Sequence, residues 1–367
     1  MRKIIITGGH VTPALSVMSE LKLRNWECIY VGRTHALEGD KTQSEEMRIV
    51  VKEGYKFIPI TTGRLQRQIT RYTLISLLKI PIGIIQAFII LLQNKPQVIL
   101  SFGGYVGLPI VLAGWCLGIP IVTHEQTLSP GLANRLSARF AKVICVSWPA
   151  LSKKFPKKRF VYTGLPVRKE IFQINKQINI QSNKPVIYIT GGNLGSHSIN
   201  EVVEKNLPQL LKTYTIIHQC GKAMNEFDYK RLINLKNQLP KDLKDNYYVY
   251  TYIDKEFIGD VFRRCDILIS RAGANIIYEI IALHKLAILI PLPWSGMKEQ
   301  EINAKFLTDH QAGVTIEQKN LSGEILLKQI PFLMENRDRY LTNLDKLKNY
   351  VVSDADKRIA QVIESVE

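Results

Sequence analysis

The chain alternates short apolar runs with amphipathic stretches, a pattern typical of a parallel sheet wound with helices. Near the start, β-branched runs at residues 3–7 and 28–32 flank a helix that we expect at about residues 12–24. Further strands are predicted at residues 97–104, 119–126, 142–147 and 159–164. The pattern therefore predicts an α/β fold built from doubly wound, Rossmann-like units.

A second β-rich start follows the irregular polar stretch "VRKEIFQINKQINIQSNK". It begins with "PVIYITGGNLGSHSINEVV" and continues with strands in "YTIIHQCGK", "YYVYTYI", "CDILISRAGA" and "LAILIPLP". A chain of 367 residues is long enough for two such domains. We expect one domain over residues 1–164 and another over 165–367, with a last charged helix able to pack back on the first.

Both predicted domains place Thr-Gly-Gly between a first strand and a helix, in "IIITGGHVTPALSV" and in "IYITGGNLGSHSINEVV". Two similar α/β domains facing one another would form a cleft, and such sheets bind ligands at the carboxyl ends of their strands. The candidate functional residues all lie at these predicted strand ends.

Charge is distributed unevenly along the chain. Residues 1–165 carry +14 of the formal net charge of +17, and Glu125 is the only acid between residues 54 and 169. This half presents a positive field, so nucleic acid, anionic lipid and a diphosphate substrate are all candidate partners. A generally basic proteome or a solubility device would explain the same excess.

Composition points to a cytoplasmic protein. The apolar run after Met1 is too short for a signal peptide, and no long uncharged apolar stretch suggests a membrane-spanning helix. The five cysteines are scattered and form no C-x-x-C pair, which argues against a disulfide framework or a zinc site. We expect reduced thiols, mostly in the core, and no metal or cofactor.

Three glycine turns precede predicted helices, at Thr7-Gly8-Gly9, Gly191-Gly192-Asn193 and Arg271-Ala272-Gly273-Ala274. Glycine lets the backbone approach a ligand, and the N–H groups of the following helix can bind phosphate. Each turn could equally be plain backbone geometry. Neither the dinucleotide fingerprint nor a P-loop is present, so nicotinamide and kinase chemistry are disfavoured.

Three side chains at these edges could take part in chemistry. His10 follows the first turn and could act as a general base, or merely cap the helix. Glu125 in "THEQT" could transfer a proton or bind a hydroxyl, or hold its own loop. Glu279 could accept hydrogen bonds from ribose hydroxyls, or be a solvated helix acid. The acid pair in "DAD", residues 354–356, reads as surface.

Residues 63–97 join basic side chains to a run of Ile, Leu and Phe. Arg64, Arg67, Arg71 and Lys79 could meet anionic headgroups while apolar neighbours enter a membrane interface. A buried domain helix competes with this interpretation, above all for residues 84–92. Because no aromatic residues alternate with the basic ones, nucleic acid is the weaker partner class.

Seven motifs in this order resemble the MurG family, the peripheral membrane N-acetylglucosaminyltransferases of peptidoglycan synthesis: "HVTPAL", "SFGGYVGLP", "IPIVTHEQ", "GLPVR", "TGGNLGS", "SRAGANIIYEI" and "EQEINA". The resemblance implies a two-domain fold of the GT-B type. It also implies inverting transfer of N-acetylglucosamine from UDP-N-acetylglucosamine to the C4 hydroxyl of lipid I, giving lipid II at the cytoplasmic face of the membrane. Cell-wall synthesis proteins are further possible partners.

The resemblance also assigns roles to residues. His10 and Glu125 match candidate catalytic positions, and Tyr105 and His124 match acceptor-side positions. Donor-side positions are matched by Thr7, Gly8, Gly9, Thr127, Arg168, Asn193, Ile253, Ala274, Asn275, Ile276, Ile277, Tyr278, Glu279 and Gln300. Ile253 would meet uracil through its backbone, Glu279 the ribose, and Gln300 the donor sugar.

The chain departs from the family pattern at several positions. Its first loop runs directly from Thr-Gly-Gly to His10 and is about three residues shorter than the family's. Thr127 and Leu165 stand where asparagine is usual, Asn193 replaces a serine, and Glu299 replaces a frequent glutamine. Two rival hypotheses are a related enzyme with another lipid or natural-product acceptor, and an inactive nucleotide-sugar-binding scaffold.

Overall fold

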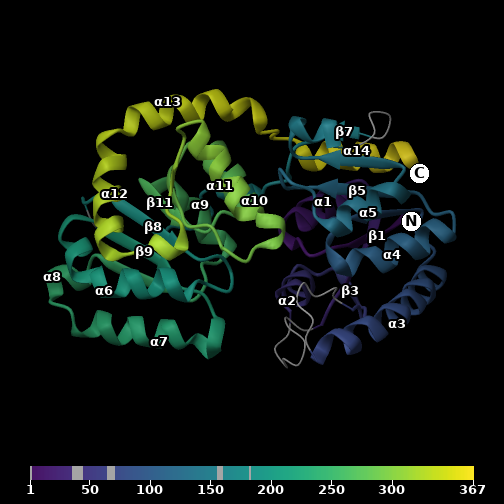
Figure 1. Cartoon of the computed structure of the whole chain (residues 1–367), viewed down its shortest axis with the longest axis horizontal. Coiled ribbons are helices and arrows are strands. Elements are labelled where there is room, and N and C mark those ends of the chain that lie inside the picture. Colours follow the sequence, from purple (N-terminus) through teal and green to yellow (C-terminus); the bar gives the residue numbers. More distant parts are fainter. Residues whose placement is uncertain (1, 35–43, 64–70, 155–159, 182) are drawn as a thin grey trace. The chain divides into compact units, whose positions relative to one another are not determined.

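The structure, a computed structural model, describes residues 2–34, 44–63, 71–154, 160–181 and 183–367. It divides into two compact units, with Met1–Arg168 and Val352–Glu367 in unit 1 and Lys169–Val351 in unit 2. Each unit is a parallel sheet flanked by helices (Figure 1). The predicted fold class, two Rossmann-like α/β domains, is confirmed.

Unit 1 holds a seven-stranded sheet in the order β3-β2-β1-β4-β5-β6-β7, with every pair parallel. Its strands are β1 (Arg2–Thr7), β2 (Trp26–Gly32), β3 (Lys56–Pro59), β4 (Val98–Ser101), β5 (Ile121–Glu125), β6 (Val143–Val146) and β7 (Phe160–Tyr162). Its helices are α1 (Val11–Leu23), α2 (Glu45–Lys52), α3 (Arg71–Asn94), α4 (Gly104–Cys116), α5 (Leu132–Phe140) and α14 (Ala355–Val366).

Unit 2 holds a six-stranded parallel sheet in the order β10-β9-β8-β11-β12-β13. Its strands are β8 (Val186–Thr190), β9 (Thr215–Gln219), β10 (Tyr247–Tyr250), β11 (Ile267–Ser270), β12 (Leu286–Leu289) and β13 (Val314–Thr315). Its helices are α6 (His197–Thr213), α7 (Ala223–Gln238), α8 (Lys241–Lys244), α9 (Lys255–Arg264), α10 (Ala274–Leu283), α11 (Glu299–Asp309), α12 (Gly323–Glu335) and α13 (Arg337–Leu347).

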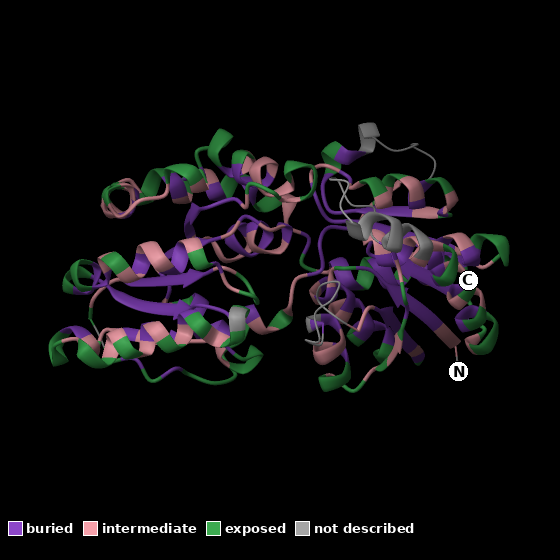
Figure 2. Cartoon of the chain, turned by 60° about the horizontal axis from the view of Figure 1, so that its bottom comes forward, coloured by how far each residue is buried: buried purple, intermediate pink, exposed green. Residues whose placement is uncertain are grey.

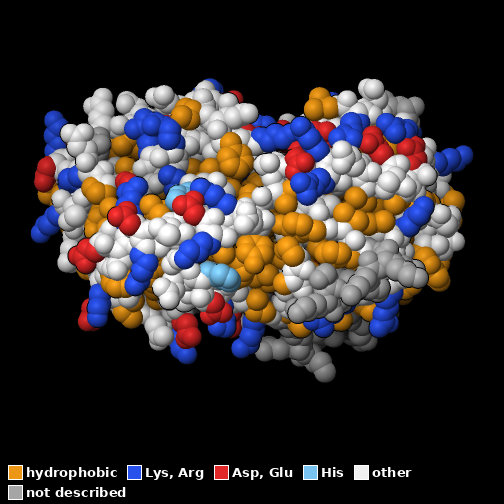
Figure 3. Space-filling model, turned by 90° about the horizontal axis from the view of Figure 1, so that it is seen from above, with side chains coloured by type: hydrophobic (Ala, Val, Ile, Leu, Met, Phe, Trp, Pro, Cys, Tyr) orange, Lys and Arg blue, Asp and Glu red, His pale blue; other side chains and the backbone are white. Residues whose placement is uncertain are grey.

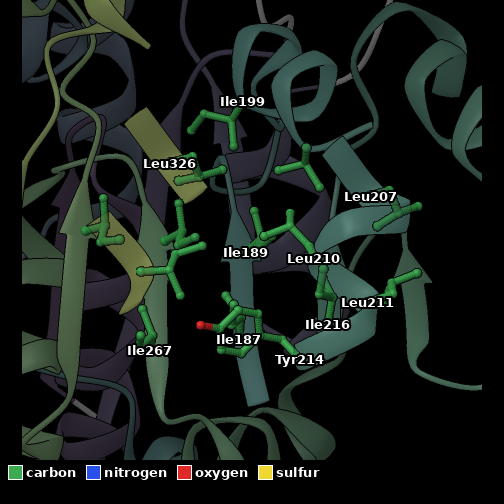
Figure 4. Packing of buried hydrophobic residues seen from close by; sticks show 14 of the residues in the cluster. Ile187, Ile189, Ile199, Leu207, Leu210, Leu211, Tyr214, Ile216, Ile267 and Leu326 are labelled. Carbon is green, nitrogen blue, oxygen red and sulfur yellow. The ribbon is translucent and has the colours of Figure 1, made fainter. Parts of the chain in front are cut away.

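Each sheet is buried between its helices, as the apolar composition of the strands requires. Figure 2 shows largely buried strands in both sheets and helices that expose one side. In unit 2, Ile199, Leu207 and Leu210 of α6 pack with Ile187 and Ile189 of the central strand (Figure 4). The central strands therefore form a rigid base for the loops at their carboxyl ends.

The polar stretch after Arg168 is bound to unit 2. The carboxylate of Asp260, which is fully buried in α9, accepts a hydrogen bond from the Ile178 amide at 2.9 Å. A Cβ on Gly259 would lie 1.9 Å from the carbonyl oxygen of Gln173, so helix and segment touch at a glycine. The segment that the sequence marks as irregular is thus held in place by α9.

The C-terminal helix α14 lies in unit 1, the arrangement that the sequence analysis allowed for the last charged helix, although the division expected at residue 165 places these residues in the second domain. It contacts α1, and its residues Ile359, Ala360 and Ile363 enter the core of unit 1. Asp356 is 3% exposed, so the surface interpretation of "DAD" is wrong for this residue. The reason is that the buried face of α14 begins at Ala355 and Asp356.

Basic and acidic side chains are interspersed with apolar ones on the face drawn in Figure 3. Within the described ranges, no helix is both long enough and apolar enough to cross a membrane. Four of the cysteines are buried and Cys116 is exposed.

Candidate functional site

Both Thr-Gly-Gly turns lie where the strand order of a sheet reverses. In unit 1 this point lies between β1 and β4, and in unit 2 between β8 and β11. At such a point the connections leave in opposite directions, which opens a crevice at the carboxyl ends of the two strands. Thr7 ends β1, and Thr190 ends β8, so both Thr-Gly-Gly turns stand at these positions.

The short first loop is held by its neighbours in unit 1. Gly8 has a φ of +134°, and a Cβ there would lie 2.9 Å from the carbonyl oxygen of Gly103. The Gly9 amide donates to that oxygen at 3.3 Å, and the buried Tyr30 hydroxyl donates to the Gly8 carbonyl at 2.5 Å. The loop therefore needs glycine at residue 8, where its backbone lies close to that of Gly103. Tyr30, which the sequence did not indicate, anchors the loop by its hydrogen bond.

His10 stands at the N-cap position of α1 and is partly exposed. No side-chain hydrogen bond from His10 caps the helix, so the capping interpretation is not supported. Loss of hydration lowers the pKa of His10 to about 4, which keeps the imidazole neutral near pH 7. A neutral imidazole with no capping bond is available to accept a proton.

Glu125 is 3% exposed at the end of β5, and both of its carboxylate oxygens are occupied. Oε1 accepts from the Thr127 amide at 2.9 Å and hydroxyl at 2.8 Å, and Oε2 accepts from Asn134 Nδ2 at 2.7 Å. Burial raises the pKa of Glu125, although these hydrogen bonds oppose the shift. The geometry favours the loop-holding interpretation, and Thr127 is engaged within the same loop.

Two acceptor-side candidates also have defined surroundings. His124 is fully buried, and its Nε2 lies 2.9 Å from the Gly164 carbonyl. Burial lowers the pKa of His124 to about 4. The Tyr105 hydroxyl accepts from Arg33 Nη1 at 2.8 Å, and Arg33 pairs with Glu46 at 3.5 Å. Both side chains are fixed in place at the strand ends.

In unit 2 the glycine loop, residues 191–196, connects β8 to α6. Its Asn193 is exposed, whereas Gly195, at φ +84°, packs so tightly that a Cβ would lie 1.9 Å from the Cys220 carbonyl oxygen. No side chain caps α6 at Ser196, nor α10 at Gly273. The first N–H groups of both helices therefore lack a side-chain acceptor, as in many phosphate sites.

Arg271 supplies a positive charge beside these helix starts. Its guanidinium donates to Ser196 Oγ at 2.6 Å, to Ser198 Oγ at 3.1 Å and to the Ile290 carbonyl at 3.0 Å. Among the residues that the structure describes, no carboxylate forms a salt bridge with it. Burial lowers the pKa of Arg271 to about 10, so it stays charged at neutral pH and favours an anion nearby.

The first turns of α10 divide between an accessible side and a buried side. Asn275 and Ile276 are partly exposed, whereas Ala274, Ile277 and Tyr278 are buried, and the Tyr278 hydroxyl donates to the Tyr350 carbonyl at 2.6 Å. Glu279 is 2% exposed, so its interpretation as a solvated helix acid is wrong. It lies on the face of the helix that packs inward.

Gln300 and Ile253 are placed by hydrogen bonds within unit 2. The Gln300 Oε1 accepts from the amides of Ala272 at 3.3 Å and Leu292 at 3.0 Å, which leaves the amide group's NH2 to meet a ligand. The Ile253 amide donates to Gln219 Oε1 at 3.0 Å. Its carbonyl is then the group with which this residue could meet a base.

The remaining candidates are less fully placed. Arg168 is partly exposed at the end of unit 1. Arg64 and Arg67 lie outside the described residues, as does the side chain of Arg71, and Lys79 is partly exposed on α3. No cluster of three or more His, Cys, Asp or Glu residues suited to a metal ion occurs in the described ranges.

Sequence analysis missed Tyr30, Arg33, Asn134 and Gln219. Each acts on a candidate residue through a hydrogen bond, which spans 9 residues for Asn134 and 22 or more for the other three. Only for Gln219 was there a signal, since it ends the predicted strand in "YTIIHQCGK".

Comparison with known proteins gives a consistent result over nearly the whole chain. Residues 5–146 match the glycosyltransferase family 28 N-terminal domain, and residues 186–359 match the C-terminal domain. A Clostridium botulinum protein and a Bacillus cereus protein are each 35% identical, with 99% of both chains covered. Both are named UDP-N-acetylglucosamine–N-acetylmuramyl-(pentapeptide) pyrophosphoryl-undecaprenol N-acetylglucosamine transferase, the Bacillus protein with the suffix 2.

Solved structures agree on the fold. Acinetobacter baumannii MurG superposes with a TM-score of 0.70 at 26% identity, and all of both chains is covered. A glycosyltransferase of kitacinnamycin gives a TM-score of 0.73 at 15% identity, which shows the shared fold alone. With two full-length relatives at 35% identity, the chain belongs to the MurG family within glycosyltransferase family 28.

Proposed function

We propose that this chain transfers N-acetylglucosamine from UDP-N-acetylglucosamine to the C4 hydroxyl of lipid I, undecaprenyl-diphospho-N-acetylmuramoyl-pentapeptide, and so forms lipid II. The names of its full-length relatives support this reaction. The structural observation that carries it is Arg271, a charged guanidinium without a carboxylate partner in the described chain, beside two helix starts that lack side-chain caps. This combination suits the diphosphate of a nucleotide sugar.

Unit 2 is the proposed donor side. The glycine loop with Asn193 and the start of α10, from Ala274 to Ile277, would bind the diphosphate through backbone N–H groups. Ile253 would meet uracil and Gln300 the sugar. The 2% exposure of Glu279 does not support the ribose contact that the resemblance assigns to its side chain. Because Ile277 and Tyr278 are buried, they contribute backbone and support rather than side-chain contacts. Arg168 and the turn Thr7–Gly9 complete the donor assignment from unit 1.

Unit 1 is the proposed acceptor side. In the reaction the acceptor's C4 oxygen attacks the sugar's C1 atom while the bond from C1 to the diphosphate oxygen breaks. A single displacement inverts the configuration at C1. His10 takes the proton from the attacking hydroxyl, and UDP leaves with the electron pair of the broken bond. Fixed positive groups, the helix N-termini and Arg271, stabilise the charge that develops on UDP.

The acceptor carries a lipid, and α3 offers a surface for the bilayer that holds it. Four exposed apolar side chains lie along one face of α3, and we call them the α3 stripe: Ile82, Ile85, Ile89 and Leu92. Their spacing of three and four residues puts them on one side of the helix, and Ala87, Ile90 and Leu91 are buried on the other. For residues 84–92, the membrane-interface interpretation thus applies to the exposed face of α3, and the buried-helix interpretation applies to the opposite face.

Further apolar and basic groups lie near the α3 stripe in unit 1. Helix α4 contacts α3. Its penultimate residue, Trp115, is 56% exposed, and the centroids of the Trp115 and Phe140 rings lie 5.1 Å apart. Lys79 lies on α3, and Lys95 follows it. We propose peripheral binding at the cytoplasmic face of the membrane, where anionic headgroups meet the basic residues and the stripe enters the interface.

Transfer to a defined acceptor tests the proposal. Purified protein is given UDP-N-acetylglucosamine labelled in the sugar and a short-chain lipid I analogue, with and without EDTA. We expect β-linked disaccharide product in both conditions, because protein groups stabilise the leaving UDP. Binding of UDP without product on lipid I would contradict the acceptor assignment, and product from another lipid acceptor alone would replace it.

A further inference from the structure

We infer that Gln219 is a positioning residue that couples the glycine loop to the base-binding segment of unit 2. This inference rests on the proposed function, because it assigns the two segments to opposite ends of a uridine diphosphate. One side-chain amide is bonded at its nitrogen to the glycine loop and at its oxygen to Ile253.

The hydrogen bonds define both ends of the link. Gln219 Nε2 donates to Thr190 Oγ1 at 3.3 Å and to the Gly192 carbonyl at 3.2 Å. Gln219 Oε1 accepts from the Ile253 amide at 3.0 Å. The side chain is 5% exposed, so water competes little for these groups.

The end of β9 is itself fixed, so Gln219 has little freedom to move. The Asn200 side chain donates to the Cys220 carbonyl at 2.9 Å and to Asp228 Oδ2 at 2.8 Å. Gly195 and Gly221 touch, since a Cβ on Gly221 would lie 2.3 Å from the Gly195 backbone. The loop, the end of β9 and the Ile253 segment therefore form one packed assembly around the amide.

This arrangement predicts that loosening either segment changes the affinity for the ligand part that meets it. Uridine needs only the base-binding segment, whereas UDP needs both segments in place. Loss of the Gln219 amide should therefore lower the affinity for both ligands, and the affinity for UDP should fall more. Loss of the loop bond alone should weaken UDP and spare uridine.

Two variants separate these outcomes. Gln219→Met keeps the length of the side chain and removes both ends of the link. Thr190→Val removes Oγ1, which accepts from Gln219 Nε2 and from the Gly192 amide, and leaves the bond from Gln219 to the Gly192 carbonyl. Binding of UDP and uridine is measured by calorimetry on the full chain, next to thermal unfolding without ligand. We expect Gln219→Met to lower the affinity for UDP about tenfold and that for uridine about threefold. Thr190→Val should lower the affinity for UDP alone, by about threefold.

The double variant and the kinetics complete the test. Because the two changes share the bond from Gln219 Nε2 to Thr190 Oγ1, the loss of UDP affinity in the double variant should be smaller than the product of the two single losses. In transfer assays of Gln219→Met, the KM for the donor should rise, while kcat at saturating donor stays within about threefold of the wild-type value. A role confined to folding stability would not separate UDP from uridine.

Other results would overturn the coupling. They are an unchanged uridine affinity in Gln219→Met, multiplied losses in the double variant, or equal losses of UDP and uridine in Thr190→Val. If Gln219→Met does not fold, the Thr190→Val comparison decides alone. Wild-type protein that does not bind UDP would overturn the proposed function as well, and this is measured before any variant.

Discussion

At the scale of single residues, His10 and Glu125 differ in what their hydrogen bonds leave free. The carboxylate oxygens of Glu125 accept from Thr127 in the loop after β5 and from Asn134 in α5, whereas the His10 imidazole makes no capping bond. A general base needs a free lone pair directed at the acceptor hydroxyl. The structure thus favours His10 as the base and Glu125 as a residue that positions the loop.

Replacement of His10 by alanine should lower kcat by about 10² to 10⁴-fold and leave UDP binding within about twofold. Since burial lowers the pKa of His10 to about 4, the imidazole stays unprotonated on mild acidification, and kcat/KM should hold from pH 7 to pH 5. Steady-state kinetics over this pH range check both statements.

Glu125→Gln is the matched comparison for the His10 result. The glutamine keeps an oxygen for the Thr127 amide, so we expect kcat to fall by less than about tenfold. A loss as large as that of His10→Ala would transfer the role of base to Glu125.

At the scale of elements, the strand patterns were sufficient to predict all strands of the two sheets except one edge strand in each. The buried strands β1, β8 and β11 are apolar runs, and sequence alone indicated them. The edge strands β3 and β13 were not predicted, because β13 has two residues and β3 has four, of which the outer two are exposed and the inner two half-buried. Short strands with one partner carry little hydrophobic signal.

The sequence pattern also does not identify which element a helix packs against or which residue a side chain binds. An amphipathic pattern indicates that α14 buries one face, but it does not indicate whether α1 or a helix of unit 2 receives that face. The glycine turns and His10 were predictable as local motifs. Tyr30 and Gln219 were not, because their role depends on contacts across 22 and 34 residues of chain.

The α3 stripe gives a prediction at the scale of an element. Ile85→Glu combined with Ile89→Glu places two charges on its most exposed part, so binding to anionic vesicles should fall at least tenfold in a flotation assay. Each buried charge in an interface costs well over 1 kcal/mol. Transfer to a soluble, short-chain acceptor should be retained within about threefold.

The control for the α3 stripe is Phe332→Glu combined with Phe172→Glu, two exposed apolar residues of unit 2. These changes should leave vesicle binding intact. Equal loss in both double variants, or binding that ignores salt, would contradict the assignment of this surface to an anionic bilayer.

At the scale of the whole molecule, each unit buries a neutral histidine in its sheet. Burial lowers the pKa of His124 to about 4 and that of His218 to about 3. In the unfolded chain both groups bind a proton below about pH 6.5, whereas in the folded chain they do not. The unfolded state thus binds more protons between pH 6.5 and 4, and the free energy of unfolding falls as the pH falls.

Chemical unfolding at pH 7 and pH 5 checks this prediction. Each buried histidine should remove up to about 1.4 kcal/mol of stability per pH unit from its own unit below pH 6.5. His218→Gln should flatten the pH dependence of the transition of unit 2. The exposed His310 provides the control, because His310→Gln should leave the dependence as it is. An unchanged slope in His218→Gln would contradict the assignment.

The placement of α14 has a consequence for biosynthesis. Unit 2 ends at Val351, while the core of unit 1 includes Ile359, Ile363 and Val366. As the chain leaves the ribosome, all of unit 2 emerges before the last helix of unit 1. Unit 2 can therefore complete its fold first. Until α14 has been synthesised, unit 1 lacks its last helix, and the face of α1 that α14 covers stays exposed. A nascent chain stalled after residue 351 should expose that apolar face to chaperones and proteases.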